Sequence, residues 1–132
     1  MENRMPITVT TSEGVLDDAA ERTILPRLTE SLLARHGLTD NDVLRPIVVG
    51  SVHVLPSGRV FSGSLAQPAI FVELKVPSMM FATKSQRQGF VDDVNAILND
   101  VTHGKHAKER TFVNITYAVA ELADAVGSSA SR

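Results

Sequence analysis

The first candidate for chemistry is a proline, Pro6, which follows Met5 and opens a run of β-branched residues at 7–11. β-Branched side chains favour an extended backbone, and proline fits the first residue of a strand because it has no N–H for the ladder. If synthesis starts at Met5 and that methionine is removed, Pro6 becomes a terminal secondary amine. Desolvation disfavours the charged form of such an amine, which could then act as a general base near neutral pH. If the chain starts at Met1, as written, the same nitrogen is an amide and accepts no proton.

Other clusters of polar residues give weaker evidence of a functional site. His103 and His106 have a His-x-x-His spacing, but they lie in a basic connection without nearby carboxylate or cysteine partners, so no metal site is expected there. Asp92 and Asp93 are adjacent and diverge around a helix, so they do not form a facing pair of carboxylates. The chain has no cysteine, which excludes a thiol nucleophile, a disulfide framework and a cysteine-based metal site.

The composition is that of an ordinary globular domain. The 132 residues are 43% hydrophobic and 21% charged, which is too apolar for disorder. A net charge of -2 and the lack of a basic stripe argue against a nucleic-acid partner. No apolar run is long enough to span a bilayer, and residues 1–4 lead into no signal-peptide core, so we expect a cytoplasmic protein without membrane contact. The domain should span 6–117, between an extension or mis-called start at 1–5 and a partly helical tail at 118–132.

Two helix patterns and several strand patterns must position these residues. The first helix pattern runs from the candidate N-cap Asp17 to Gly37 and contains Pro26, which should kink or restart it. The second begins with the capping-box pair Thr83 and Gln86 and carries a regular apolar stripe. The strand patterns lie at 6–11, 46–55, 69–76 and 111–117, with a short strand or arm at 59–63 and a short helix at 118–126.

The elements follow each other as strand, helix, strand, and then in the same order again. A crossover helix joins parallel strands, so each half should hold one parallel pair. We expect an α+β fold in which two tandem β-α-β units form one mixed sheet with two helices on one face. The opposite face carries mixed residues such as Phe71, Glu73 and Lys75, so it must meet water or another subunit.

Several short motifs follow the pattern of a known family. They are Pro6 after Met5, Val52-His53-Val54-Leu55-Pro56, the stretch from Pro56 through Gly63, Ile70-Phe71-Val72, Val91-Asp92-Asp93-Val94 and Phe112-Val113-Asn114. In this order and spacing the chain resembles the tautomerase superfamily, and in particular its dehalogenase-like members and those like macrophage migration inhibitory factor. The resemblance covers the chain from about Pro6 to Tyr117.

The resemblance implies a homotrimer with a pocket at each subunit boundary and the amino-terminal proline at its floor. In such enzymes that proline is the base of keto–enol isomerisation, and no metal or organic cofactor is needed. The dehalogenase-like members hold a substrate carboxylate with two arginines after the third main strand, where this chain has Pro77 and Met80. A thioether or a pyrrolidine ring cannot replace a bidentate guanidinium contact, so a more apolar pocket is expected.

The resemblance also points to four further site residues. Phe112 and Asn114 fall where the family places a pocket-lining Tyr or Asn. Asn114 could donate a hydrogen bond to a substrate oxygen, or satisfy a neighbouring backbone group. Lys75 could supply the missing cation, or occupy a solvated or interface face. His36 lies where dehalogenase-like members carry a pocket histidine, although a helix C-terminus also favours such a residue.

The state of Pro6 separates two functions. As a free amine it would be the base in keto–enol isomerisation of a small carbonyl compound, with Asn114 and the backbone amides at 77–79 binding the substrate oxygen. If the Pro6 nitrogen is instead acylated by the preceding Arg4-Met5, it cannot act as a base. The protein would then be a non-catalytic trimer that serves as a binding or scaffold module. A ferredoxin-like small-molecule binder, unrelated to this family, is the third interpretation.

Overall fold

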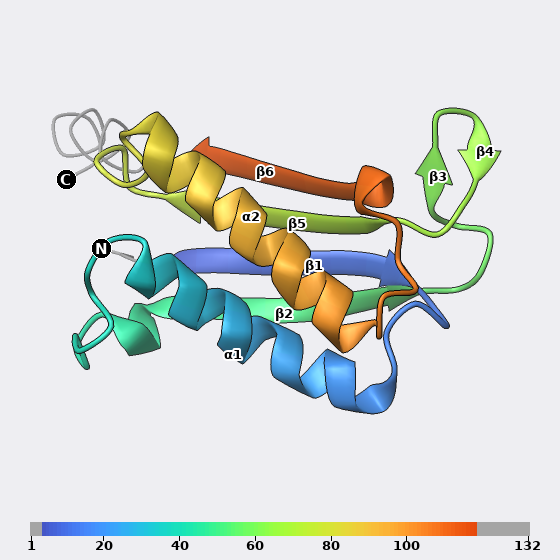
Figure 1. Cartoon of the computed structure of the whole chain (residues 1–132), viewed down its shortest axis with the longest axis horizontal. Coiled ribbons are helices and arrows are strands. Elements are labelled where there is room, and N and C mark those ends of the chain that lie inside the picture. Colours follow the sequence, from blue (N-terminus) through green and yellow to red (C-terminus); the bar gives the residue numbers. More distant parts are fainter. Residues whose placement is uncertain (1–3, 119–132) are drawn as a thin grey trace, which may run out of the picture.

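Figure 1 shows two long helices packed across one face of a sheet, in a computed structural model that describes residues 4–118. The chain order is β1 (Met5–Ser12), α1 (Asp18–Ala34), β2 (Val48–Leu55), β3 (Phe61–Ser62), β4 (Leu65–Ala66), β5 (Ile70–Val76), α2 (Lys84–Val101) and β6 (Thr111–Tyr117). Short 3-10 turns at Arg45–Ile47 and Lys108–Arg110 precede β2 and β6. The predicted helix at 118–126 and the tail after it lie outside the described residues, apart from Ala118. Within the described range, no helix is long and apolar enough to cross a membrane.

The main sheet has the strand order β2-β1-β5-β6. β1 pairs with β2 and β5 pairs with β6 in parallel, whereas the two central strands, β1 and β5, are antiparallel. Each parallel pair is joined across one helix, α1 or α2, because parallel strands need a crossover connection. This arrangement confirms the predicted α+β fold of two tandem β-α-β units in one mixed sheet.

The hydrophobic core lies between the helices and the sheet face that they cover. Every second side chain of a strand points to the same face, and on β5 the buried set is the predicted one: Ile70, Val72, Leu74 and Val76. The helices contribute apolar stripes of buried side chains, which include Ile24, Leu28, Leu32, Phe90, Val94 and Leu98. Burial of these stripes is the main stabilising contribution to both helices.

β1 begins at Met5, one residue before the predicted start of the domain. The Met5 side chain is 1% exposed and lies in the core cluster with Ile7 and Val9. Pro6 is exposed and Thr8 is half-buried, because alternate residues of a strand face opposite sides of the sheet. In the chain as written, Met5 is therefore a core residue and Pro6 is a surface residue.

The helix starts agree with the capping signals in the sequence. Asp17 accepts a hydrogen bond from the Ala20 N–H at 2.8 Å, and Thr83 and Gln86 form the reciprocal capping box. Pro26 was expected to kink or restart the helix; the restart is wrong, because α1 continues through that residue as one helix. Interior proline costs about 3 kcal/mol, and the buried apolar stripe on both sides of Pro26 offsets that cost.

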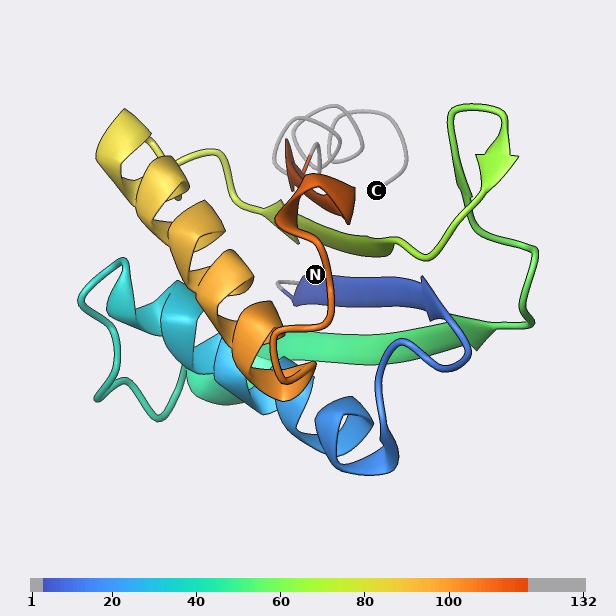
Figure 2. The same ribbon diagram turned by 45° about the vertical axis from the view of Figure 1, so that its right-hand side comes forward.

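β3 and β4 form a small antiparallel hairpin that stands apart from the main sheet, as both ribbon views show (Figures 1 and 2). Its turn contains Gly63 at φ 62°, a left-handed conformation that glycine adopts at little cost. Phe61 and Leu65 on this hairpin are largely exposed. The predicted short strand or arm at 59–63 is therefore one half of a projecting hairpin.

Candidate functional site

Within residues 4–118, no element covers the sheet face opposite the helices, and this open face carries the candidate site. On this face the strands present every second residue, and the pairing register aligns these residues into rows across the sheet. Thr8 pairs with Glu73, which in turn pairs with Asn114, and Lys75 pairs with Thr116. Pro6 precedes Thr8 by two residues, so it lies on the same face and in the row of Lys75.

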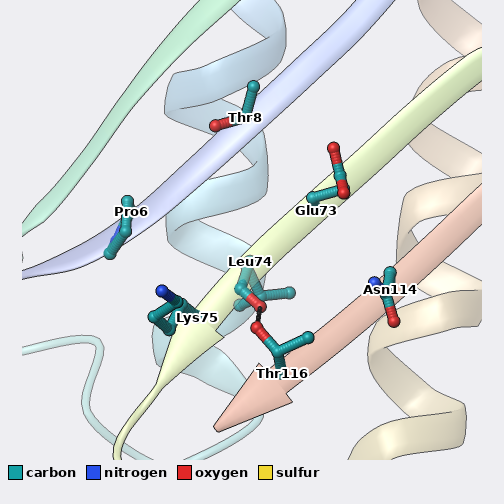
Figure 3. Close-up of a pocket in the computed structure, with 7 residues that line it drawn as sticks. All are labelled: Pro6, Thr8, Glu73, Leu74, Lys75, Asn114 and Thr116. Carbon is teal, nitrogen blue, oxygen red and sulfur yellow. Dashed lines mark hydrogen bonds between the residues drawn. The ribbon is translucent and has the colours of Figure 1, made fainter. Parts of the chain in front are cut away.

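A groove of about 290 Å³ lies on this open face (Figure 3). It crosses the three strands β1, β5 and β6, and its lining residues are Pro6, Thr8, Glu73, Leu74, Lys75, Asn114 and Thr116. Three of the seven residues predicted from the sequence, Pro6, Lys75 and Asn114, thus line one groove. They come from positions far apart in the chain, and the strand order brings them together.

Three polar side chains of the groove keep their hydrogen-bonding capacity, whereas the Thr116 hydroxyl donates to the Leu74 carbonyl oxygen at 3.3 Å. Glu73, Lys75 and Asn114 form no side-chain hydrogen bond or ion pair with any residue in the described part of the chain. A carboxylate is an acceptor, an ammonium is a donor and an amide is both. The groove can therefore offer two hydrogen-bond donors, Lys75 and Asn114, and one acceptor carboxylate, Glu73, to a small molecule.

Glu73 is the groove residue that sequence reasoning missed. The alternation of β5 indicated that Glu73 and Lys75 share the outer face, but only Lys75 was assigned to the site. The signal that could have found Glu73 is its position two residues before Lys75, because residues i and i+2 of a strand are neighbours on one face. Its row partners Thr8 and Asn114 could not be recognised without the register.

The other four predicted site residues lie outside the lining of the groove. Phe112 is on the open face, where its ring stacks on Phe71 at 5.3 Å. Pro77 begins the loop after β5, and its carbonyl accepts the Met80 N–H at 3.0 Å. The Met80 side chain is buried in the core. The loop at 77–82 therefore lies next to the groove, but the side chains of Pro77 and Met80 do not line the groove.

His36 follows α1 and lies on the helix side of the sheet. Its Nε2 accepts a hydrogen bond from the Phe81 N–H at 2.9 Å, and its Nδ1 is 2.9 Å from the Leu32 carbonyl oxygen. Both ring nitrogens are thus occupied by backbone groups. No free nitrogen remains for a ligand in this arrangement, and the groove lining does not include this histidine.

No protein-family model matches the chain, and no curated protein matches it significantly. Solved structures do resemble it. A fused 4-OT, solved as a symmetric trimer, gives a TM-score of 0.70 at 11% identity over 86% of this chain and 85% of that chain. A member of the cis-3-chloroacrylic acid dehalogenase family gives 0.65 at 17% identity over 86% and 74%. A malonate semialdehyde decarboxylase inhibited by 3-bromopropiolate gives 0.65 at 11% identity over 96% and 98%.

These similar proteins are members of the tautomerase superfamily. At such low identity the comparison shows that the chain shares their fold. The resemblance that the sequence motifs indicated is therefore confirmed at the level of the fold, with tandem β-α-β units in one mixed sheet.

Proposed function

We propose that the chain is a tautomerase-superfamily enzyme that catalyses keto–enol isomerisation of a small carbonyl compound without a metal or an organic cofactor. The observation that supports this proposal is the convergence of Pro6, Lys75 and Asn114 in one groove on the open face. The three side chains supply a base, a cation and an amide donor, which are the groups that enolisation requires.

The proton transfer can be written with these residues. The Pro6 nitrogen, as a free secondary amine, takes a proton from the carbon next to the substrate carbonyl. The electron pair of that C–H bond forms a C=C bond, and the π pair of the C=O bond moves to the oxygen. The Asn114 amide and the Lys75 ammonium donate hydrogen bonds to the oxygen as it becomes negative. The proton is then returned to the enolate oxygen, and the amine is restored.

Self-association is the second part of the proposal. The open face holds the stacked rings of Phe71 and Phe112, and Phe112 is 41% exposed. An aromatic pair on an uncovered sheet face favours burial against another subunit. The similar fused 4-OT is a symmetric trimer, so we propose a homotrimer in which neighbouring copies close the groove.

Replacement of the proline tests the catalytic proposal. In a chain that begins at Pro6, as verified by intact mass, Pro6→Ala should lower the turnover of an enolisable substrate by about a hundredfold or more. Pro68→Ala is the matched control, because Pro68 is exposed and lies outside the groove. Turnover that is unchanged in Pro6→Ala, with the oligomer intact by light scattering, would remove Pro6 from catalysis.

A second candidate function is favoured by the burial of Met5. Loss of this methionine frees the Pro6 nitrogen but removes a core side chain that is 1% exposed, and deletion of a buried methionine side chain costs about 2–5 kcal/mol. A chain that retains Met5 keeps this packing and keeps Pro6 as an amide. Such a protein would bind a small carbonyl ligand in the groove without turnover, and an intact mass that includes Met5 in protein from its natural source is the expected result.

A further inference from the structure

The loop between β5 and α2 contains a strained aromatic residue, Phe81. Its φ is 52°, and its side chain is completely buried. A bulky residue with positive φ is an outlier in backbone conformation, and it persists only where the surroundings hold it. The surroundings of Phe81 therefore determine the conformation of the loop.

Three elements hold the backbone and ring of Phe81. Its N–H donates to His36 Nε2, just after α1, at 2.9 Å. Its carbonyl oxygen accepts hydrogen bonds from Arg87 Nη1 on α2 at 2.8 Å and from the Tyr117 hydroxyl on β6 at 3.1 Å. The ring contacts His36 edge-on, with centroids 4.5 Å apart, and packs at a tilt against Phe90 at 5.3 Å. We call the His36–Phe81 contact the loop latch.

The latch requires one protonation state of His36. Because Nε2 accepts the Phe81 N–H, it carries no proton, so the proton of the neutral ring resides on Nδ1 and is donated to the Leu32 carbonyl oxygen. A protonated imidazole has a donor at both nitrogens. It would direct an N–H at the Phe81 N–H and remove the hydrogen bond.

We propose that neutral His36 is a positioning residue that fixes the 77–82 loop beside the groove, and that protonation of His36 releases this loop. The loop leaves β5 directly after Lys75 and Val76, and β5 runs antiparallel to β1. The end of β5 therefore lies beside the start of β1, where Pro6 is placed (Figure 3). The consequence for turnover rests on the proposed function, whereas the latch itself does not.

The other ionisable groups around the latch are arginines, a tyrosine and an aspartate. Arg87 on α2 donates to the Phe81 carbonyl, and Tyr117 on β6 donates to the same oxygen. Arg35 precedes His36 and pairs with Asp93 on α2 at 2.7 Å. Arginine and tyrosine keep their charge states between about pH 5 and about pH 8, and the hydrogen bond from Arg35 holds the pKa of Asp93 below its ordinary value.

Amide hydrogen exchange at Phe81, measured by NMR without substrate, tests the latch. In the wild type, the protection of this amide should fall about tenfold between about pH 8 and about pH 5, as expected for the loss of one hydrogen bond. His36→Phe should have low protection at both pH values. His36→Gln supplies a carbonyl acceptor that does not titrate, so it should restore protection and abolish the pH dependence.

Two controls separate the latch from global unfolding and from general histidine effects. The Val72 amide in β5 reports global opening in the same spectra, and His53→Gln changes an exposed histidine on β2. Protection of the Val72 amide should be the same at both pH values, and His53→Gln should leave the pH dependence of Phe81 protection unchanged. Protection of Phe81 that is equal at both pH values, or equal in His36→Phe and the wild type, would overturn the proposal.

The nitrogen shifts of the imidazole give a second test in the unmodified protein. At neutral pH, the ¹⁵N spectrum should show His36 with a protonated Nδ1 and an unprotonated Nε2. The opposite tautomer would contradict the latch even if every variant failed to fold. Because neither measurement uses a substrate, a failed Pro6→Ala test would leave the latch in place, and a failed exchange test would leave the proposed function in place.

Discussion

The two faces of the sheet differ in how their polar side chains are used. On the helix side, Asp93 on α2 accepts hydrogen bonds from Arg35 at 2.7 and 2.8 Å and from the Ser31 hydroxyl at 2.8 Å, which ties α2 to the end of α1. On the open side, Glu73 and Lys75 lie two residues apart in a groove, and within residues 4–118 neither pairs with any side chain. These polar side chains on the helix side are paired within the chain, whereas Glu73 and Lys75 on the open side remain available to bind a ligand or another subunit.

The difference has a physical cause in the layering of the fold. Each helix covers the same face, so that face acquires apolar burial and peripheral ion pairs. In the described part of the chain the opposite face receives no helix, and its mixed residues are compatible with water in the free chain. The residues on the helix side therefore contribute most of the stability, and the residues on the open side form the candidate site.

The largest expected effect compares two neighbours on β1. Ile7 is 1% exposed on the helix face, and Thr8 lies on the open face. Ile7→Ala should lower the free energy of unfolding by about 2–5 kcal/mol because it leaves a cavity in the core. Thr8→Ala should change it by about 1 kcal/mol or less. Urea denaturation of both variants measures this contrast, and similar losses would show that the two faces contribute equally to stability.

A substitution on β6 examines the open face itself. Asn114→Ala should lower turnover by about tenfold to a hundredfold, because it removes an amide donor from the groove. The midpoint of urea denaturation should stay close to that of the wild type, since the side chain has no partner within the described residues. Asn95→Ala on α2 is the matched control. Equal turnover in the two variants would contradict the assignment of Asn114.

The smallest expected effect concerns the ion pair on the helix face. Hydrogen bonding from Arg35, reinforced by Ser31 and opposed by partial burial, holds the pKa of Asp93 below its ordinary value. A depressed carboxyl pKa contributes stability above the unfolded-state pKa of about 4, and this contribution is lost as the pH falls through the folded-state pKa. Asp93→Asn should therefore cost about 1 kcal/mol at neutral pH, a modest value because the pair is partly exposed.

Urea denaturation of Asp93→Asn and the wild type at a series of pH values measures this contribution. The difference in free energy of unfolding between the variant and the wild type should decrease as the pH falls below about 4. Asp18→Asn serves as the control, because the Asp18–Arg22 pair is much more exposed and should contribute little. If the difference in free energy of unfolding grows on acidification, the ionised Asp93 carboxylate does not stabilise the fold.

Much of the fold follows from local patterns. The caps at Asp17 and Thr83, the alternation of β5 and the repeated order of strand, helix and strand predicted the helix starts, the buried face and the parallel pairs. These signals lie within a few residues of each other, so no knowledge of distant contacts is needed to recognise them. The restart at Pro26 was wrong because packing against the sheet outweighs a local penalty.

The candidate site was only partly predictable. Pro6, Lys75 and Asn114 were selected, but Glu73 was not, since its place in the groove depends on pairing with strands far away in the sequence. His36 was a candidate because it lies where dehalogenase-like members carry a pocket histidine. Its partner Phe81 lies 45 residues away, and the contact depends on an unusual backbone conformation that no local pattern indicates.

The sequence by itself determined which segments become helices and strands and which side of each strand is apolar, because those properties depend on residues that are close in the chain. The tertiary structure alone decided that β1 lies between β2 and β5, that Pro6 shares one groove with Lys75 and Asn114, and that His36 Nε2 accepts the Phe81 N–H. These outcomes depend on which distant strands exchange hydrogen bonds, and strand register sets the face that each side chain occupies.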